Sequence, residues 1–168
     1  MGTEGFIFRT IRQDEMDQAL RIEHQCFPPN EACSERHMKQ RILEAQELFF
    51  VVEDPESEQI VGFLNGIATE EACFRDEFFT DASIHDPNGR NIMLLSLAVL
   101  PEYQMRGLAR ALVSHYLEHA QQEGRKKVFL TCLDEKVAMY QKFGFQDLGM
   151  ADSAWGGEAW HEMYVDLG

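Results

Sequence analysis

The hydrophobic pattern divides the chain into short strands and helices. Residues 92–99 form an almost wholly apolar run, which is long enough for a strand buried on both faces and too short for an ordinary helix. Pro101 ends this strand, and a turn that contains Gly107 follows. Apolar residues then recur with the spacing of one helical face, at positions 109, 112, 113, 116, 117 and 120. The centre of the chain is therefore predicted to be a strand, a glycine turn and a helix.

The flanking segments are predicted to complete one α/β domain, residues 1–168. Alternation and turn residues predict strands at residues 6–12, 48–53, 60–67, 127–132, 144–148 and 160–165. Helices are predicted at residues 14–27, with Asp14 as the cap, and at residues 34–43 and 134–143. The strand-helix-strand unit in residues 92–132 implies parallel neighbours joined by a right-handed crossover. Residues 70–88 have no clean hydrophobic period, so they are predicted to be partly helix and partly loop. This segment could form a wall of the substrate site, or it could be an ordinary excursion of the chain on the surface.

Acidic residues outnumber basic ones by a wide margin. The 168 residues include 15 Lys and Arg against 29 Asp and Glu, a formal charge of −14. This charge disfavours nucleic acid and anionic membranes as partners and favours cations. The four cysteines show no metal-like or disulfide-like spacing, and no apolar run approaches the ~20 residues of a membrane span. We therefore expect a cytoplasmic protein with reduced thiols, as a monomer or a homodimer.

Gly107 marks a candidate anion site. A glycine at the start of a helix lets the backbone approach a ligand, and the free N–H groups of the first helical turn then face that ligand. The G-x-G-x-x-G and Gly-Lys-Ser/Thr patterns are both missing here, which disfavours a dinucleotide fold and a P-loop. The alternative for the isolated motif is an ordinary tight turn that needs one glycine.

Two separated motifs give the chain a family resemblance. Leu97-Ala-Val99 followed by Gln104-Met-Arg-Gly107-Leu-Ala109 resembles the acetyl-CoA signature Q/R-x-x-G-x-G/A of the GNAT acyltransferases. Tyr140-Gln-Lys-Phe-Gly-Phe145 resembles their second signature, Y-x-x-x-G-F. The segments at residues 27–32 and 85–89 look like parts of the arylalkylamine (serotonin-type) N-acetyltransferase branch and its microbial relatives.

The resemblance implies a fold and a set of roles. It implies a mixed, mostly antiparallel sheet, flanked by helices, that splays at a parallel strand pair beside Val99, where acetyl-CoA enters. Backbone N–H groups of Leu97, Ala98 and Val99 would hold the pantetheine arm and the acetyl carbonyl. The pyrophosphate would lie on the amides of Met105, Arg106, Gly107, Leu108, Ala109 and Arg110, with charge from the two arginines. Tyr140 would protonate the leaving thiolate.

Each assignment has a plainer alternative. The two arginines could be solvated partners of nearby acids, and Tyr140 could be a core tyrosine with a satisfied hydroxyl. The general base is open, because the positions of the two histidines in the animal enzymes hold Met93 and Leu95 here. Ser96 could orient a water molecule, the remaining candidate bases are Glu23, Glu31 and His85, and a water chain could replace them all. His115 and His119 have i, i+4 spacing, but with no third ligand a solvated pair is favoured over zinc.

The expected function is acetyl-CoA-dependent N-acetylation of a small primary amine, arylalkylamine-like or polyamine-like, by direct attack on the thioester and without a metal. Phe27, Pro28, Glu31 and His85 are the candidate substrate residues, and aromatic residues at positions 74–79 are expected to offer a surface for an apolar amine. A protein N-terminal or lysine acetyltransferase of the same fold is the first alternative. A non-catalytic acyl-CoA-binding sensor is the second.

Overall fold

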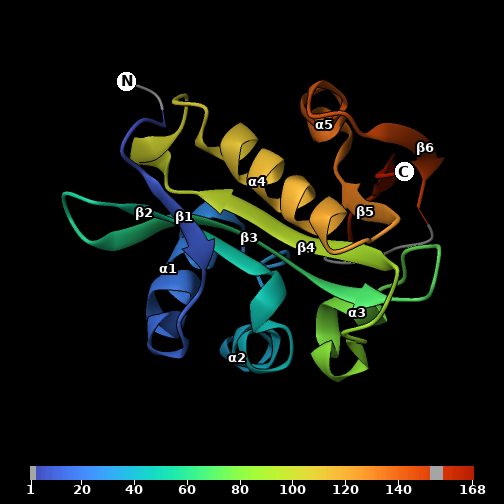
Figure 1. Ribbon diagram of the computed structural model, residues 1–168, viewed down its shortest axis with the longest axis horizontal. Helices are drawn as coiled ribbons and strands as arrows, with labels where there is room; N and C mark the ends of the chain where they lie inside the picture. Colours follow the sequence, from blue (N-terminus) through green and yellow to red (C-terminus); the bar gives the residue numbers. More distant parts are fainter. Residues whose placement is uncertain (1–2, 152–156) are drawn as a thin grey trace.

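The computed structural model describes residues 3–151 and 157–168. Within these residues a seven-stranded sheet has the order β1-β2-β3-β4-β5-β7-β6. The apolar runs of the sequence form its central strands, which are buried on both faces. The strands are β1 (Ile7–Thr10), β2 (Phe49–Asp54), β3 (Gln59–Thr69), β4 (Asn91–Val99), β5 (Lys127–Cys132), β6 (Gln146–Met150) and β7 (His161–Asp166), as Figure 1 shows.

The strand pairing confirms the predicted fold class. Strands β4 and β5 run parallel, and the other pairs found in the described residues are antiparallel. The parallel pair is short, because its register extends only from Asn91 opposite Lys127 to Met93 opposite Phe129. The two strands therefore separate well before Val99, where the sequence placed the splay. Toward the other edge, β4 stays paired with β3 as far as Val99.

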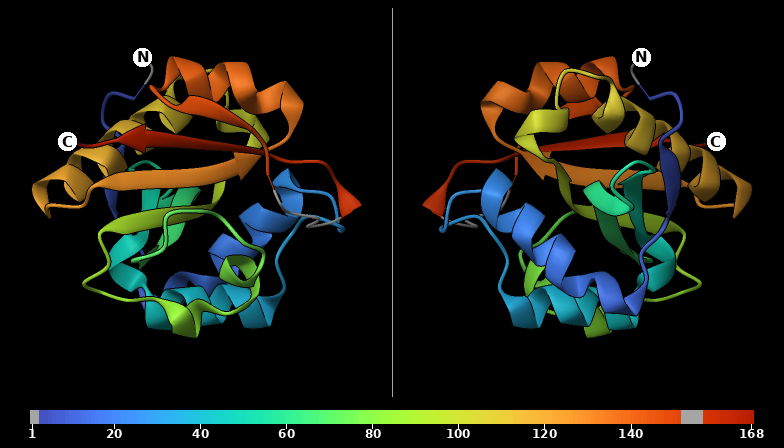
Figure 2. Two further views of the ribbon diagram at one scale, coloured as in Figure 1. Left: turned by 90° about the vertical axis from the view of Figure 1, so that its right-hand side faces the viewer. Right: turned by 90° about the vertical axis from the view of Figure 1, so that its left-hand side faces the viewer.

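Helices cover both faces of the sheet (Figures 1 and 2). Helices α1 (Met16–Cys26), α2 (Glu35–Glu44) and α3 (Glu77–Thr80) lie on one face, and α4 (Leu108–Gln122) and α5 (Val137–Lys142) lie on the other. Short 3₁₀ turns join several elements: η1 (Gln13–Glu15), η2 (Gln46–Leu48), η3 (Ala82–Ile84), η4 (Pro101–Tyr103) and η5 (Asp134–Lys136). No helix in the described ranges is long and apolar enough to cross a bilayer.

Each face has its own apolar core. Helix α4 buries Leu112, Val113, Tyr116 and Ala120 against the sheet, as its spacing predicts. The buried Tyr116 hydroxyl donates a hydrogen bond to the Leu48 carbonyl at 2.8 Å. On the opposite face, α1 and α2 bury a second cluster that includes Ala19, Ile22, Met38 and Ile42. The cores hold the helices firmly on both sides of the separated strands.

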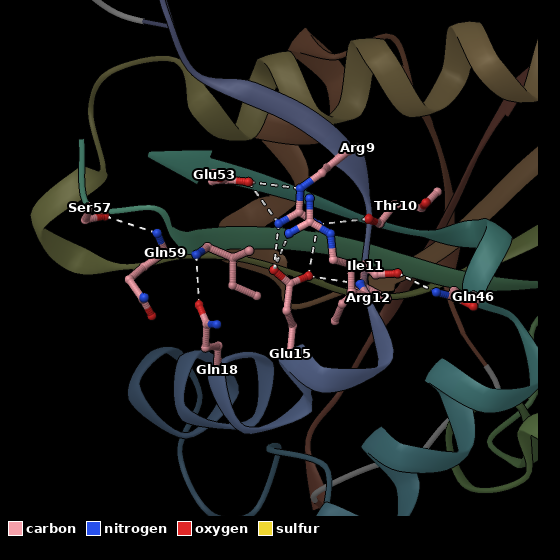
Figure 3. Close-up of polar contacts among 11 residues, drawn as sticks. Arg9, Thr10, Ile11, Arg12, Glu15, Gln18, Gln46, Glu53, Ser57 and Gln59 are labelled. Carbon is pink, nitrogen blue, oxygen red and sulfur yellow. Dashed lines mark hydrogen bonds and ion pairs between the residues drawn. The ribbon is translucent and has the colours of Figure 1, made fainter. Parts of the chain in front are cut away.

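A partly buried ion-pair network fixes the start of α1 (Figure 3). Arg9 Nε donates to Glu53 at 3.0 Å, while its two terminal nitrogens donate to Glu15 at 2.9 and 2.6 Å. Glu15 also accepts from the Arg12 amide at 2.9 Å. The predicted Asp14 cap is therefore wrong, because the chain first forms η1 and the Glu15 carboxylate ties this turn to β1 and β2. The network sets the direction in which α1 runs toward the centre of the sheet.

The insert at residues 70–88 is packed rather than open. It forms α3 and η3, and its aromatic side chains Phe74, Phe78 and Phe79 are at most 6% exposed. They pack with Met93 and Leu95 of β4 in a third cluster. The prediction that these aromatic residues offer a surface for an amine is therefore wrong for Phe74 and Phe78, because both rings are buried in this apolar cluster. Phe79 alone of the three lines the central cavity described below.

Candidate active site

A cavity of about 790 Å³ opens where β4 and β5 have separated. Its walls include residues 94–99 of β4 and residues 130–133 at the end of β5. Side chains from α1 and α2 line it on one face of the sheet, and residues of α4 and α5 line it on the other. A molecule in this cavity can therefore be reached from both faces of the sheet.

The free edge of β4 presents backbone groups to the cavity. The Val99 carbonyl accepts from Gln104 Nε2 at 2.9 Å and from Cys26 Sγ at 3.3 Å, so it does not pair with β3. The next amide, of Leu100, does donate to Val61 in β3. Because the N–H and C=O of one residue point to the same strand edge and alternate along the strand, Leu97 and Val99 face the gap. Ala98, also a predicted cofactor residue, directs its backbone to β3 while lining the cavity.

The turn after β4 has the geometry of an anion cradle. Gly107, the N-cap of α4, has φ +83°, and Met105 has φ +65° and is fully exposed. A side chain added to Gly107 would meet no atom within 4 Å, so open space faces this glycine. The Gly107 carbonyl accepts the first helical bond from the Ala111 amide, which leaves the earlier amides of α4 directed outward. Met105, Gly107, Leu108, Ala109 and Arg110 all line the cavity.

Arg106 takes a different course from its neighbours. It is not part of the cavity wall, and its guanidinium lies over the ring of Tyr103 at 5.2 Å. Tyr103 is in turn anchored through a 2.6 Å hydrogen bond from its hydroxyl to Asp54. The structure therefore places Arg110 in the cavity wall and Arg106 against Tyr103 without a place in that wall, where the sequence had given both arginines the same role.

Tyr140 presents a free hydroxyl to the cavity. Its ring packs edge-on against Phe143 and Phe145, with centroids 6.0 and 5.8 Å away. The hydroxyl has no hydrogen-bond partner among the described residues, so the alternative of a core tyrosine with a satisfied hydroxyl does not fit. Burial raises the pKa of Tyr140, and the charge of Cys132 raises it further. The side chain therefore remains a proton donor across the neutral and alkaline range.

A buried carboxylate and a buried guanidinium line the opposite side. Glu23 is 2% exposed, and its Oε2 accepts from the Cys33 amide at 3.0 Å while its Oε1 has no partner among the described atoms. Arg41 is 3% exposed, and it donates through Nη2 to the Phe79 carbonyl at 3.0 Å, with Nε and Nη1 unpartnered. Burial raises the pKa of Glu23, and the charge of Arg41 opposes that rise. Both side chains thus keep hydrogen-bonding capacity at the cavity wall.

Arg41 is the functional candidate that the sequence reasoning missed. It lies between Met38 and Ile42 on the buried face of α2. A charge within an apolar helical stripe was the available signal, because such a residue is rarely buried without a partner. Trp160 and Glu135 also line the cavity without having been predicted, and they come from segments that no local motif connects to it.

The remaining sequence candidates separate into two groups. Phe27, Pro28 and Glu31 line the cavity, as does Ser96, whose Oγ accepts from Asn65 Nδ2 at 2.9 Å. His85 lies outside the wall, because its Nδ1 accepts from the Ala68 amide at 2.9 Å and its Nε2 lies 2.9 Å from Glu47.

The histidine pair of α4 also lies elsewhere. The His115 ring stacks on Phe8 with centroids 4.4 Å apart, and His119 lies 3.3 Å from Glu123. Across residues 3–151 and 157–168, no three histidine, cysteine or acidic side chains come together as a metal site.

Comparisons with known proteins agree with this geometry. The model of the acetyltransferase (GNAT) family matches residues 14–145, which confirms the resemblance seen in the motifs. Serotonin N-acetyltransferase of Mesocricetus auratus is 33% identical over 95 residues, which cover 56% of this chain and 44% of that protein. The chain thus matches less than half the length of this relative.

Solved structures share the whole fold. The loading GNATL domain of CurA from Lyngbya majuscula has a TM-score of 0.83 at 16% identity, covering 96% of this chain and 98% of that chain. The GphF GNAT-like decarboxylase in complex with isobutyryl-CoA has a TM-score of 0.80 at 18% identity, covering 96% and 100%. The ribosomal-protein-S18-alanine N-acetyltransferase from Escherichia coli has a TM-score of 0.71 at 18% identity, covering 96% of this chain and 94% of that chain.

The glycine turn yields the first prediction. Replacing Gly107 with valine places a branched side chain in the open space before α4 and strains a left-handed backbone position. We expect acetyl-CoA affinity, measured by calorimetry, to fall by about tenfold or more. Gly124→Val is the matched control, because Gly124 has φ +82°, equally open surroundings and no place in the cavity wall. If the Gly107→Val protein folds and binds acetyl-CoA with unchanged affinity, the assignment of this turn as the anion cradle is wrong.

Proposed function

Because the chain belongs to the acetyltransferase (GNAT) family, we propose that it is an N-acetyltransferase that moves the acetyl group of acetyl-CoA to a small primary amine, arylalkylamine-like or polyamine-like. One observation carries this proposal. The cavity at the separated strands brings together the free edge of β4, the amino end of α4 and the unpartnered hydroxyl of Tyr140.

The α4 face of the cavity fits the cosubstrate. Acetyl-CoA supplies the acetyl group as a thioester, together with an anionic pyrophosphate. The outward amides before and within the first turn of α4, with the charge of Arg110, suit the pyrophosphate. The amides of Leu97 and Val99 suit the pantetheine arm and the thioester carbonyl. A single well-placed amide at such a carbonyl is worth about 3 kcal/mol in the transition state.

The opposite face fits the amine. Phe27, Pro28 and Phe79, which follow α1 or lie in α3, supply apolar contacts there, and Trp160 also lines the cavity. Cosubstrate and acceptor would thus approach the β4 edge from opposite faces, which favours direct attack without an acyl-enzyme. Cys26 is a poor covalent nucleophile, since burial raises the pKa of its thiol and its Sγ donates to the Val99 carbonyl.

Two side chains suit the proton transfers. Tyr140 would donate its proton to the departing thiolate, because its hydroxyl is unpartnered and protonated at working pH. Glu23 would receive the proton that the amine loses. Its Oε1 is unpartnered, and it lies one helical turn before Cys26, which contacts β4. Met93 and Leu95, at the histidine positions of the animal enzymes, are buried and cannot serve.

The two alternatives make different demands. A sensor needs no proton donor, so the free hydroxyl of Tyr140 favours an enzyme. A protein acetyltransferase needs room for a polypeptide, while similarity to a serotonin N-acetyltransferase supports a small acceptor. Turnover with tryptamine, phenethylamine, spermidine and a peptide separates the three. A peptide preferred over all the amines would overturn the substrate class. Binding of acetyl-CoA without turnover of any acceptor would instead favour the acyl-CoA-binding sensor.

The role of Tyr140 leads to the second prediction. Tyr140→Phe should lower kcat by about tenfold or more with acetyl-CoA affinity little changed, since a general acid acts only in the transition state. Folding stability should hold, because the hydroxyl has no partner to lose among the described residues. Tyr164→Phe on β7 is the control and should leave kcat unchanged. Normal turnover with reduced stability would instead show a structural tyrosine.

The third prediction is a pH profile. The amine must be neutral to attack, and a primary amine with a pKa of about 10 is mostly an ammonium ion at neutral pH. Because the pKa of Tyr140 is raised, its acid form persists as the pH increases, so it adds no falling limb in this range. We expect kcat/KM for phenethylamine to rise about tenfold per pH unit from pH about 7 to 9. A profile that is flat above neutral pH would contradict rate control by the free amine.

A further inference from the structure

Three carboxylates from distant segments lie near one another beside the cavity. Glu31 follows α1, Glu135 lies in η5, and Glu158 precedes β7. Glu31 and Glu135 line the cavity, and Glu158 accepts from Asn30 Nδ2 at 3.4 Å, which places it beside the Glu31 segment. Burial raises the pKa of Glu31, and the charges of Glu158 and Glu135 and a side-chain hydrogen bond with Glu158 raise it further, so both carboxylates lie near Glu31.

The charge at this end of the cavity is negative. Lys136 follows Glu135 in η5 and also lines the cavity, so one lysine accompanies the three carboxylates in the part of the chain that the structure describes. Glu31 and Glu158 already share a side-chain hydrogen bond, and a cation that joins the group stabilises the negative charge that remains. This cluster, defined here as the carboxylate triad Glu31, Glu135 and Glu158, therefore favours a positively charged group of the acceptor.

The inner wall has a different balance of charge. Glu23 and Arg41 are both buried there and of opposite sign, so together they contribute no net charge. Oε1 of Glu23 is nevertheless an acceptor without a partner among the described residues. An amine nitrogen can donate to this atom while remaining free of a strong negative field. The cavity thus offers a neutral polar position inside and a negative position at the carboxylate triad.

We infer that the acceptor is a diamine or polyamine whose distal ammonium binds the carboxylate triad while its reacting nitrogen lies near Glu23. This inference rests on the proposed function and names its substrate class. In the reaction the reacting nitrogen forms a bond to the thioester carbonyl carbon, and the carbon–sulfur bond breaks. The sulfur takes the proton of Tyr140, and Glu23 takes the proton that the nitrogen loses. The distal ammonium keeps its charge throughout.

A matched pair of substrates tests the inference. 1,5-Diaminopentane and pentylamine have the same carbon chain and differ in the distal ammonium. We expect kcat/KM to be about tenfold or more higher for the diamine at low salt, and this preference to shrink at about 0.5 M sodium chloride because salt screens exposed charges. Glu31→Gln, Glu135→Gln and Glu158→Gln should each lower the preference by about two- to fivefold. Glu56→Gln is the control, since Glu56 is exposed in the turn between β2 and β3.

The outcomes separate this inference from the proposed function. A diamine preference that survives in the triple variant, or equal turnover of the two amines by the wild-type protein, would overturn the role of the triad while amine acetylation stands. Loss of pentylamine turnover in the same variants would show general damage to the site and would also count against the inference. If no amine is acetylated, the proposed function fails. Calorimetry with spermidine and coenzyme A then tests the triad directly, and binding that the triple variant retains would overturn its role.

Discussion

The early separation of β4 and β5 is the constraint on which the rest of the structure depends. The two strands pair over three residues and then diverge, although β4 continues to Val99 beside β3. A central strand with one bare edge is costly, because buried backbone groups need partners. Gln104 and Cys26 provide partners for the Val99 carbonyl, and the amides of Leu97 and Val99 remain for a ligand. Binding of a thioester cosubstrate would complete this edge of the sheet.

The two cores hold the gap open from opposite sides. Helix α4 is fixed by its buried stripe, and α1 is fixed by the network of Arg9, Glu15 and Glu53. Because these two helices, and α2 through its buried Met38 and Ile42, are anchored away from the gap, they can carry groups into it that are poor for stability. The unpartnered Oε1 of Glu23 and the unpartnered nitrogens of Arg41 are such groups, each costing about 1–3 kcal/mol when buried without a partner. We interpret that cost as the preorganisation of an acceptor site.

Local chemistry made most of the fold predictable from the sequence. The helical stripe of α4, the apolar run of β4 and the turn at Gly107 depend on neighbouring residues, and the structure has all three where they were predicted. The proposed cofactor side of the site comes from the same stretch. Its motif fixes a strand edge, a turn and a helix end in one continuous segment.

The proposed acceptor side could not be predicted in the same way. Its residues come from α1, α2, η5 and the segment before β7, and only the tertiary arrangement brings them together. His85 belongs to a family-like motif, but its ring contacts the Ala68 amide and Glu47. Its segment packs the end of the insert against β3 and η2 and does not reach the cavity. Arg41 had no motif at all. Where β4 and β5 separate was likewise missed, since it depends on how far two distant strands stay in register.

Hydrogen exchange of the backbone amides with and without acetyl-CoA tests the central claim most directly. If the bare edge of β4 and the amino end of α4 hold the cosubstrate, exchange should slow at Leu97, at Val99 and at residues 108–110, since a bound ligand protects the amides it contacts. The small hollow of about 210 Å³ formed by residues 87–90 and 123–125 should not change. Protection at that hollow, with unaltered exchange at β4 and α4, would contradict the account.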